Sequence, residues 1–269
     1  MKSHSLKELS IQISLSGLSF CILNRSDLKV EFLKRIDFKN KLVPEAVLVE
    51  LQGIIANEPL LSPPFESVLV IFQNELSNLV PEEYFEEQNA ADFLKFSSKI
   101  IKTDFIAHDR IEANQSINVF VPYMNINNYL FEIYGEFEYK HASTILLEQI
   151  LNKEEGSIDD KMYINVEPFH FEMVVVKKGQ IQLFNTFEYF TKEDFIYFIL
   201  FSVEQLKLDP ENLIVKLTGP IAKNDVLYQL LYTYIRYVEF DAPSKTYSYS
   251  DTIEVNSKHQ YSLILNSFN

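Results

Sequence analysis

The five histidines and the single cysteine are the side chains best suited to metal binding or nucleophilic catalysis, and their spacing supports neither. No two histidines form an H-x-x-x-H or H-E-x-x-H pair, and Cys21 alone cannot form a disulfide or a cysteine-based metal site. The run His108-Asp109-Arg110 suggests part of a catalytic triad, but no glycine-flanked nucleophile serine accompanies it. His170 lies between two phenylalanines in an alternating stretch, which favours a solvent-facing or hydrogen-bonded interior histidine over a ligand. We therefore expect no metal site and no triad hydrolase.

Phosphate-binding loops of the common kinds are missing from the sequence. The chain has only six glycines, and none of them forms a G-x-G-x-x-G or Walker A pattern. Apolar residues make up 47% of the chain, which is enough to build a core and excludes disorder as the main state. No apolar run approaches the roughly 20 residues that span a bilayer, and the start of the chain lacks the apolar core of a signal peptide. We expect a soluble cytoplasmic protein.

The net charge of −14 argues against direct binding of nucleic acids or anionic membranes, because phosphates require clustered Lys and Arg. Several acids crowd one segment: Glu82, Glu83, Glu86, Glu87 and Asp92. Two interpretations stay open, a solvated face and a docking surface for a basic protein partner. Residues 1–155 hold 23 acids and 14 bases, so a basic partner would more readily meet the first half of the chain.

Alternating and helical hydrophobic periods predict an α/β chain. In the first half we expect strands at 9–15, 18–23, 28–38 and 67–72, a helix opening at Pro44, an acidic helical segment from Pro81 to about Ser98, two strands within 104–122, helices at 125–134 and 143–151, and a strand at 137–139. Charged and polar residues 152–160 form the best linker, which predicts domains at 1–155 and 156–269.

The second half repeats the order of the first. Strands are expected at 162–166, 169–176, 181–187, 213–217 and 238–240, with helices from Thr191 to about 208 and from Asn224 or Asp225 to about 237. Residues 261–268 form either a final helix that packs on the body or a partner-binding tail. A shift of 153 residues places Ile11–Ser14 on Ile164–Glu167 and Leu23–Leu28 on Val176–Ile181. This supports two similar α/β domains, with a chance match of strand patterns as the alternative.

Three short stretches carry a resemblance to a known superfamily: Tyr163–Glu167, Val175–Gly179 and Val215–Pro220. They resemble the actin-like ATPase superfamily, in particular bacterial pilus-assembly and cell-division actin homologues, whose second domain opens with an Asp-x-Gly strand end, a Lys-Asn-Gly hairpin and later an adenosine-contacting Thr-Gly-Gly turn. The whole chain also resembles an uncharacterised bacterial family of unknown function. The resemblance implies a duplicated ribonuclease H-like fold, with two mixed-sheet domains and an interdomain cleft.

The resemblance also identifies degenerate nucleotide-binding positions in both domains: Gln12, Ser14, Ser16 and Gly17, then Asn165, Glu167, Thr218 and Gly219. Active members carry Asp where Gln12 and Asn165 stand, and an amide lacks the negative charge that Mg²⁺ requires. Turn two has a carboxylate and Pro168 in place of glycine, and Pro220 replaces the second adenosine-turn glycine.

The sequence thus predicts a protein-interaction or scaffold module that is no ATPase, has no catalytic residue and needs no cofactor. The alternative is a switch that binds ATP without efficient hydrolysis. Tyrosines left over from the core of the helix that follows Asp225 leave homo-oligomerisation open.

Overall fold

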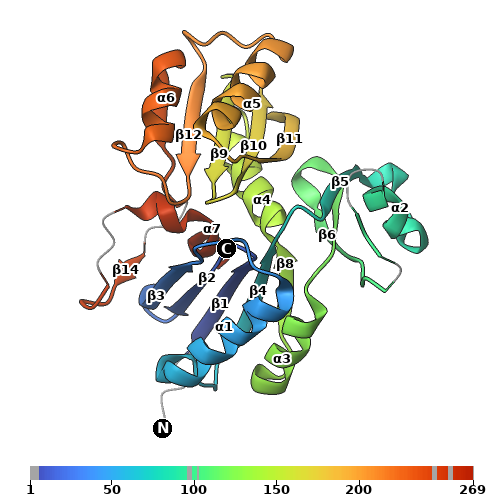
Figure 1. Cartoon of the computed structure of the whole chain (residues 1–269), viewed down its shortest axis with the longest axis vertical. Coiled ribbons are helices and arrows are strands. Elements are labelled where there is room, and N and C mark those ends of the chain that lie inside the picture. Colours follow the sequence, from blue (N-terminus) through green and yellow to red (C-terminus); the bar gives the residue numbers. More distant parts are fainter. Residues whose placement is uncertain (1–5, 96–98, 102, 244–246, 254–256, 269) are drawn as a thin grey trace. The chain divides into compact units, whose positions relative to one another are not determined.

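The computed structural model describes residues 6–95, 99–101, 103–243, 247–253 and 257–268. The chain forms two compact units (Figure 1). Unit 1 comprises Met1–Leu146, Lys245–Val255 and Ile264–Asn269, and unit 2 comprises Leu147–Ser244 and Asn256–Leu263. The units divide inside helix α4 (Ala142–Glu154), whereas the sequence-based limit after residue 155 falls at the end of that helix. The domain limits 1–155 and 156–269 stay a prediction.

Unit 1 is built on a mixed sheet with the strand order β14-β3-β2-β1-β4-β8. Strands β1 (Lys7–Ser14), β2 (Gly17–Asn24) and β3 (Lys29–Asp37) form the expected antiparallel meander, and β4 (Ser67–Gln73) and β8 (Glu138–His141) continue it in parallel. The short strand β14 (Ser248–Tyr249) pairs with β3 at the other edge.

Helices α1 (Pro44–Asn57) and α3 (Met124–Tyr134) cover one face of this sheet. Alternate residues of β1, β2 and β4 pack there against Val47 and Leu51 of α1 and Ile126 and Leu130 of α3. Pro44 occupies the first turn of α1, as the sequence predicts, because the missing N–H has no helical partner there in any case. A 3₁₀ turn, η1 (Pro59–Leu61), follows α1.

A smaller antiparallel sheet is inserted between β4 and β8. It has the order β5-β7-β6, from β5 (Ser77–Pro81), β6 (Ala107–Ile111) and β7 (Ser116–Phe120), with the 3₁₀ turn η4 (Glu112–Asn114) joining the last two. Helix α2 (Ala90–Lys95) packs on it through Ala90 and Leu94.

The expected long helix from Pro81 is wrong for most of its length. Strand β5 ends at Pro81, and two 3₁₀ turns, η2 (Glu82–Tyr84) and η3 (Glu87–Asn89), precede the six-residue α2, while 96–98 lie outside the described residues. The like-charge pairs Glu82/Glu86 and Glu83/Glu87 are consistent with this, because they destabilise a continuous helix.

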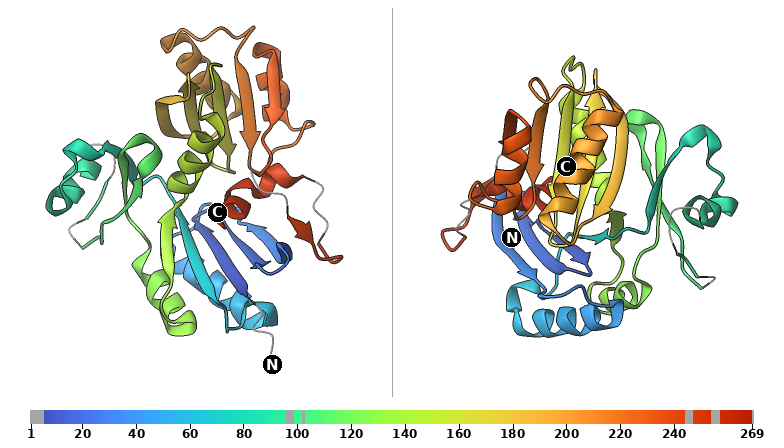
Figure 2. Two further views of the ribbon diagram at one scale, coloured as in Figure 1. Left: turned by 180° about the vertical axis from the view of Figure 1, so that it is seen from behind. Right: turned by 45° about the horizontal axis from the view of Figure 1, so that its top comes forward.

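Unit 2 has the strand order β11-β10-β9-β12-β13. The meander β9 (Lys161–Val166), β10 (His170–Lys177) and β11 (Gln180–Glu188) is followed by helix α5 (Lys192–Gln205), strand β12 (Ile214–Thr218), helix α6 (Val226–Tyr234) and strand β13 (Tyr237–Phe240). Figure 2 shows α5, in gold, lying across this sheet. The capping box of Thr191 and Asp194 fixes the start of α5, as predicted. The turn η5 (Lys258–Tyr261) runs into the C-terminal helix α7 (Ser262–Asn266).

The two units repeat one topology. In each, a three-stranded meander is extended by two parallel strands, and the predicted shift of 153 residues places Gly17–Asn24 on His170–Lys177, the full extent of β2 and β10. The same shift places Gln12 on Asn165. None of the helices formed by the described residues combines the length and apolarity that a bilayer-spanning segment needs.

Candidate functional site

In unit 1, Gln12 lies near the carboxyl end of β1 and is hydrogen bonded to the last residue of the neighbouring strand. Its Nε2 donates to Oε1 of Gln73 at 2.7 Å, and both side chains are buried. Ligands of open α/β sheets bind outside the carboxyl ends of the strands, so this is the edge where a ligand is expected. An amide pair occupies the position here, and it offers no negative charge for a cation.

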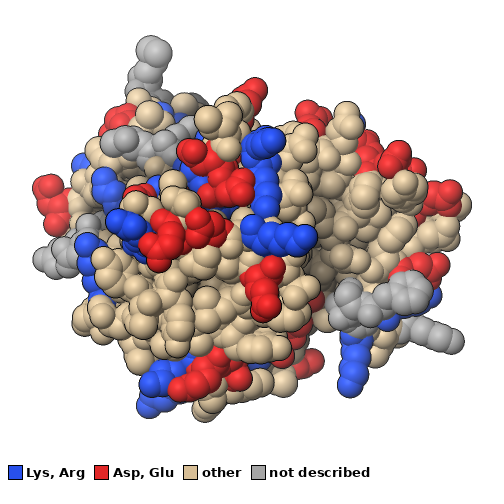
Figure 3. Space-filling model, turned by 90° about the horizontal axis from the view of Figure 1, so that it is seen from above, with Lys and Arg blue, Asp and Glu red and all other residues tan. Residues whose placement is uncertain are grey.

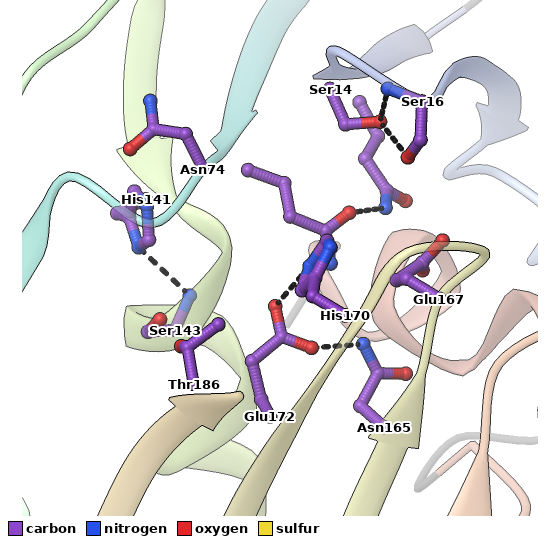
Figure 4. A network of polar contacts seen from close by, with 12 residues as sticks. Ser14, Ser16, Asn74, His141, Ser143, Asn165, Glu167, His170, Glu172 and Thr186 are labelled. Atoms are coloured by element: carbon purple, nitrogen blue, oxygen red, sulfur yellow. Dashed lines mark hydrogen bonds and ion pairs between the residues drawn. The ribbon is translucent and has the colours of Figure 1, made fainter. Parts of the chain in front are cut away.

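The turn after β1 is closed by its own hydroxyl groups. Ser14 Oγ donates to the carbonyl oxygen of Gly17 at 3.1 Å, accepts from the Ser16 N–H at 3.1 Å and lies 2.9 Å from Ser16 Oγ (Figure 4). A Cβ on Gly17 would stand 2.5 Å from the carbonyl oxygen of Ile36, so glycine is required where β2 meets the end of β3. The sequence-predicted residues of unit 1 are thus adjacent, but packing and the turn itself explain Gly17 and both serines.

Two further polar residues at the strand ends of unit 1 were missed by the sequence analysis. Asn74 follows β4, where its Nδ2 donates to the carbonyl of Val121 at 2.9 Å and its Oδ1 accepts from the N–H of Leu76 at 2.9 Å. His141 ends β8, and its Nδ1 accepts from the Ser143 N–H at 3.2 Å in the first turn of α4 (Figure 4). A polar residue at or directly after the end of an apolar strand is the sequence signal that could have identified Asn74 and His141.

Asp109 holds the start of α4 in place. Its carboxylate accepts from the His141 N–H at 2.8 Å and from Thr144 Oγ at 2.6 Å, and Thr144 Oγ in turn accepts from Asn118 Nδ2 at 3.0 Å. A carboxylate is favourable at a helix N-terminus. These contacts connect β6 of the inserted sheet to helix α4. Asp109 of the sequence His108-Asp109-Arg110 therefore has a structural role.

In unit 2, Asn165 is held between two partners at the carboxyl end of β9. Its Nδ2 donates to Oε2 of Glu172 at 2.9 Å (Figure 4), and its Oδ1 accepts from Oγ1 of Thr218 at 2.8 Å. Glu172 is buried, and Nε2 of His170 lies 3.4 Å from its Oε1. Glu172 was missed, because only the antiparallel register of β9 and β10 brings it opposite Asn165.

The turn after β9 is built by main-chain contacts around the buried Glu167. The Glu167 N–H donates to the carbonyl of His170 at 2.9 Å, and the hydroxyl of Tyr189 donates to the Glu167 carbonyl at 2.6 Å. Burial and the nearby Glu167 charge raise the pKa of Tyr189 to about 12, so its hydroxyl keeps its proton. The turn therefore presents a buried carboxylate, which repels phosphate.

Gly219 directly follows β12 and lies close to the main chain at the end of β9. Its φ is +87°, and a Cβ there would stand 1.9 Å from the carbonyl oxygen of Val166. Its N–H donates to the carbonyl of His259 at 3.0 Å. Unit 2 thus brings its four predicted residues together at one sheet edge. Among the residues that the structure describes, no group of three or more His, Cys, Asp or Glu side chains is arranged to hold a metal ion.

Two cavities lie within single units. One of about 350 Å³ is in unit 2 beyond the ends of β12 and β13, lined by Ala222, Lys223, Phe240, Ala242, Ser257, Lys258 and His259. His259 stacks on Phe240 at 4.0 Å between ring centroids, and its Nε2 lies 2.7 Å from the carbonyl oxygen of Ile221. Burial lowers the pKa of His259, which keeps the ring neutral.

The other cavity, of about 510 Å³, is in unit 1 at the start of β1 and β4. Four glutamates line it, with Arg25 as the one basic residue: Glu8, Glu66, Glu136 and Glu138. Arg25 Nε is 2.8 Å from Glu8 Oε2, so one of the four carboxylates is already paired. On the face shown in Figure 3, acidic and basic side chains are interspersed, with no single field of positive charge.

The duplicated meander with two added parallel strands defines the actin-like ATPase fold, and solved structures share it. A Bacteroides thetaiotaomicron protein with actin-like ATPase fold and unknown function matches with a TM-score of 0.74 and 24% identity, over 88% of this chain and 91% of its own. The PilM–PilN type IV pilus biogenesis complex matches with a TM-score of 0.59 and 12% identity, over 96% of both chains. The ethanolamine utilization protein EutJ of Carboxydothermus hydrogenoformans matches with a TM-score of 0.50 and 8% identity, over 97% of this chain and 88% of its own.

The chain belongs to the family described as "Protein of unknown function (DUF3822)", whose model matches residues 1–238. Among curated proteins, none matches the chain. The predicted fold class and the predicted resemblance, to an uncharacterised family and to the actin-like superfamily, are both confirmed.

Proposed function

We propose that this chain is a non-catalytic protein of the actin-like ATPase fold that acts by binding other proteins. The observation that carries the proposal is the amide at each strand end. Gln12 is bonded to Gln73, and Asn165 is bonded to both Thr218 and Glu172. Phosphoryl transfer depends on a metal ion held by carboxylates and on a positioned water, and neither amide supplies a charge for that metal.

The turns beside these amides support the same conclusion. Ser14 and Ser16 bond to each other and to the turn backbone, so their hydroxyls are already engaged. The buried Glu167 places a negative charge where a phosphate would need positive partners or free amides. Gly17 and Gly219 are each required by a close backbone contact, so their retention does not call for a ligand.

A basic protein segment is the partner class that fits unit 1. The first half of the chain is acidic, and the cavity of about 510 Å³ gathers some of its glutamates in one concave site. A Lys or Arg side chain entering this cavity would meet Glu66, Glu136 and Glu138. The PilM protein of the matching complex is itself seen bound to PilN, which supports a binding role by analogy of fold alone.

A second candidate function is a nucleotide-binding switch without efficient hydrolysis. The cavity of about 350 Å³ in unit 2 is the observation in its favour, because the flat rings of Phe240 and His259 and the two lysines that line it suit a planar anionic ligand. On this alternative, binding would not depend on Mg²⁺, since neither strand end supplies a carboxylate at the amide position.

Thermal unfolding with ATP, ADP or GTP, each with and without Mg²⁺, separates these functions. A ligand at about a hundred times its Kd stabilises by about 2.7 kcal/mol, which gives a clear shift of the midpoint. The non-catalytic binder shows no shift with any nucleotide. A shift that needs Mg²⁺ contradicts both proposals. A shift of the unfolding midpoint that needs no Mg²⁺ would support the nucleotide-binding switch, provided that Lys223→Ala abolishes it. The exposed control Lys192→Ala should keep the same shift.

The partner proposal is tested by affinity capture with paired charge reversals. Glu136→Lys with Glu138→Lys reverses two of the four glutamates that line the cavity. Glu86→Lys with Glu87→Lys changes the charge equally at the turn before α2. A partner that is captured by the wild-type chain and the second variant, but not by the first, supports the cavity. Equal loss in both variants would show general electrostatic attraction instead.

A further inference from the structure

Strand β11 is an edge of the unit 2 sheet. Eight of its nine residues pair with β10, with Gln182 left over at a register shift, and no other strand among the described residues pairs with its outer side. The equivalent strand in unit 1, β3, is paired over its first two residues: β14 lies parallel to it, with Ser248 opposite Lys29 and Tyr249 opposite Val30. The same position in the repeated topology therefore accepts an added strand in one unit and is open in the other.

β11 lacks most of the features that protect edge strands, and its bulge lies near one end. Proteins block edges with proline, lysine or bulges that twist the strand away. The strand reads QIQLFNTFE, with no proline, no basic residue and one acid at its end. The irregularity in its pairing lies at the hairpin end, between Val175 and Val176, so Leu183–Glu188 keeps a regular register. A regular, nearly uncharged edge of this length is suited to pairing with another chain.

An exposed aromatic surface on α5 adjoins this edge. The ring of Phe187 on β11 stacks on Phe198 at 4.8 Å, Phe198 contacts Tyr197 at 5.5 Å, and Tyr197 stacks on Phe201 at 6.0 Å. Tyr197 is 60% exposed and Phe201 is 47% exposed, and Phe190, between β11 and α5, is 86% exposed. Aromatic side chains are enriched in the buried parts of interfaces.

The charges at the two ends of β11 are complementary to each other. The hairpin end carries Lys177 and Lys178, and the other end carries Glu188, with Glu193 in the first turn of α5. If a second copy pairs antiparallel and the pair is centred on Leu183, Lys178 of each copy comes level with Glu188 of the other. Two-fold symmetry repeats this contact, so opposite charges face each other at both ends of the pair.

We propose that β11 and the aromatic surface of Phe190, Tyr197 and Phe201 form an interface between two copies of this chain, joined by antiparallel pairing of β11 with β11. This mode extends the unit 2 sheet through main-chain hydrogen bonds and buries the exposed rings of α5 against the partner copy. It goes beyond the proposed function, because it involves neither the strand-end amides nor the glutamate-lined cavity.

Sedimentation velocity of the full chain over a wide concentration range tests the interface. We expect the wild-type chain to dimerise. Asn185→Lys places a charge on the exposed, regular part of β11, and Tyr197→Ser with Phe201→Ser removes two of the exposed rings. Each change should raise the dimer Kd at least about tenfold. The matched control is Tyr232→Ser with Tyr234→Ser on α6, which changes equally exposed rings outside the interface and should leave the Kd unchanged.

A charge exchange tests the antiparallel orientation. Lys178→Glu should weaken the dimer, and adding Glu188→Lys should restore it, with circular dichroism and thermal unfolding showing that each variant is folded. A wild-type chain that is monomeric at every concentration overturns the proposal. So does a dimer that is unaffected by both the β11 and the α5 substitutions, or one that the α6 control weakens equally.

Discussion

Asn165 and Glu172 face each other across the β9–β10 pair, with the amide of Asn165 donating to the carboxylate of Glu172 at 2.9 Å. Both side chains are buried. The carboxylate beside position 165 therefore comes from Glu172 on the neighbouring strand β10. Asn165 itself is neutral, and its amide donates a hydrogen bond to this carboxylate. An aspartate at 165 would face Glu172 without a proton between them.

Asn165→Asp should therefore destabilise the protein by about 1–3 kcal/mol near neutral pH, because a lost donor is replaced by a buried like charge. One carboxyl of the new pair acquires a raised pKa in the folded state. A carboxyl whose pKa is raised by folding stabilises the folded state below its unfolded pKa, and this stabilisation disappears as pH rises through the folded pKa. The destabilisation caused by Asn165→Asp should therefore be smaller at about pH 5 than at neutral pH. Urea unfolding at both pH values measures this.

The control for this prediction is Asn128→Asp, an exposed position on α3, where the loss of unfolding free energy should be small and nearly independent of pH. Recovery of stability in Asn165→Asp on adding Mg²⁺ would contradict our interpretation, since it would show that one substitution restores a metal site.

Gly219→Ala should cost more than about 2 kcal/mol of unfolding free energy, because the positive φ is strained for alanine and its Cβ would overlap the Val166 carbonyl. Gly53→Ala is the matched control. It lies inside α1, where a Cβ meets nothing within 4 Å, so it should stabilise by about 0.5–1 kcal/mol. Urea unfolding of both variants gives the comparison, and equal effects would contradict the structural account of Gly219.

The sequence was sufficient to predict those parts of the fold that depend on local periodicity. The meanders, the helix at Pro44, the capping box at Thr191 and the repeat follow from patterns within a few residues of each other, and the resemblance adds the strand-end residues. Gln73 and Glu172 were missed because each acquires its role from a partner on another strand, which alternation alone does not identify. Strand β14 was missed for the same reason, since two residues become a strand only by pairing with β3.

Lys161→Met should destabilise the protein by about 3–5 kcal/mol, because it leaves the Glu154 carboxylate buried without its cation. Burial alone would raise the pKa of Glu154, but hydrogen bonds from Lys161, Tyr163 and Ser157 outweigh it and hold that pKa below its ordinary value. A lowered carboxyl pKa contributes stability that is present above the unfolded pKa and is lost as pH falls through the folded one.

In Lys161→Met the pKa of Glu154 should instead be raised, so this variant should gain stability relative to the wild type as the solution is acidified. Urea unfolding across acidic pH measures the reversal. The exposed Lys192→Met is the control, because its ion pair with Glu193 is long and solvent-exposed and should be worth less than about 0.5 kcal/mol. Parallel pH profiles for Lys161→Met and the wild type would show that Glu154 does not depend on Lys161.

His259→Phe should remove a stability loss that the wild-type chain shows on mild acidification. Burial lowers the pKa of His259, so the folded state binds its proton more weakly than the unfolded state does. The stability contributed by the neutral ring is therefore complete above the unfolded histidine pKa of about 6.5 and decreases as pH falls towards the folded pKa.

Phenylalanine keeps the stack on Phe240 but loses the contact with the Ile221 carbonyl, so the variant should be less stable than the wild type near pH 8 by about 1 kcal/mol. This difference in unfolding free energy should narrow below about pH 6. Unfolding free energies of the two proteins over this range test the prediction, together with the NMR titration of the His259 ring, and a difference that does not change with pH would refute it.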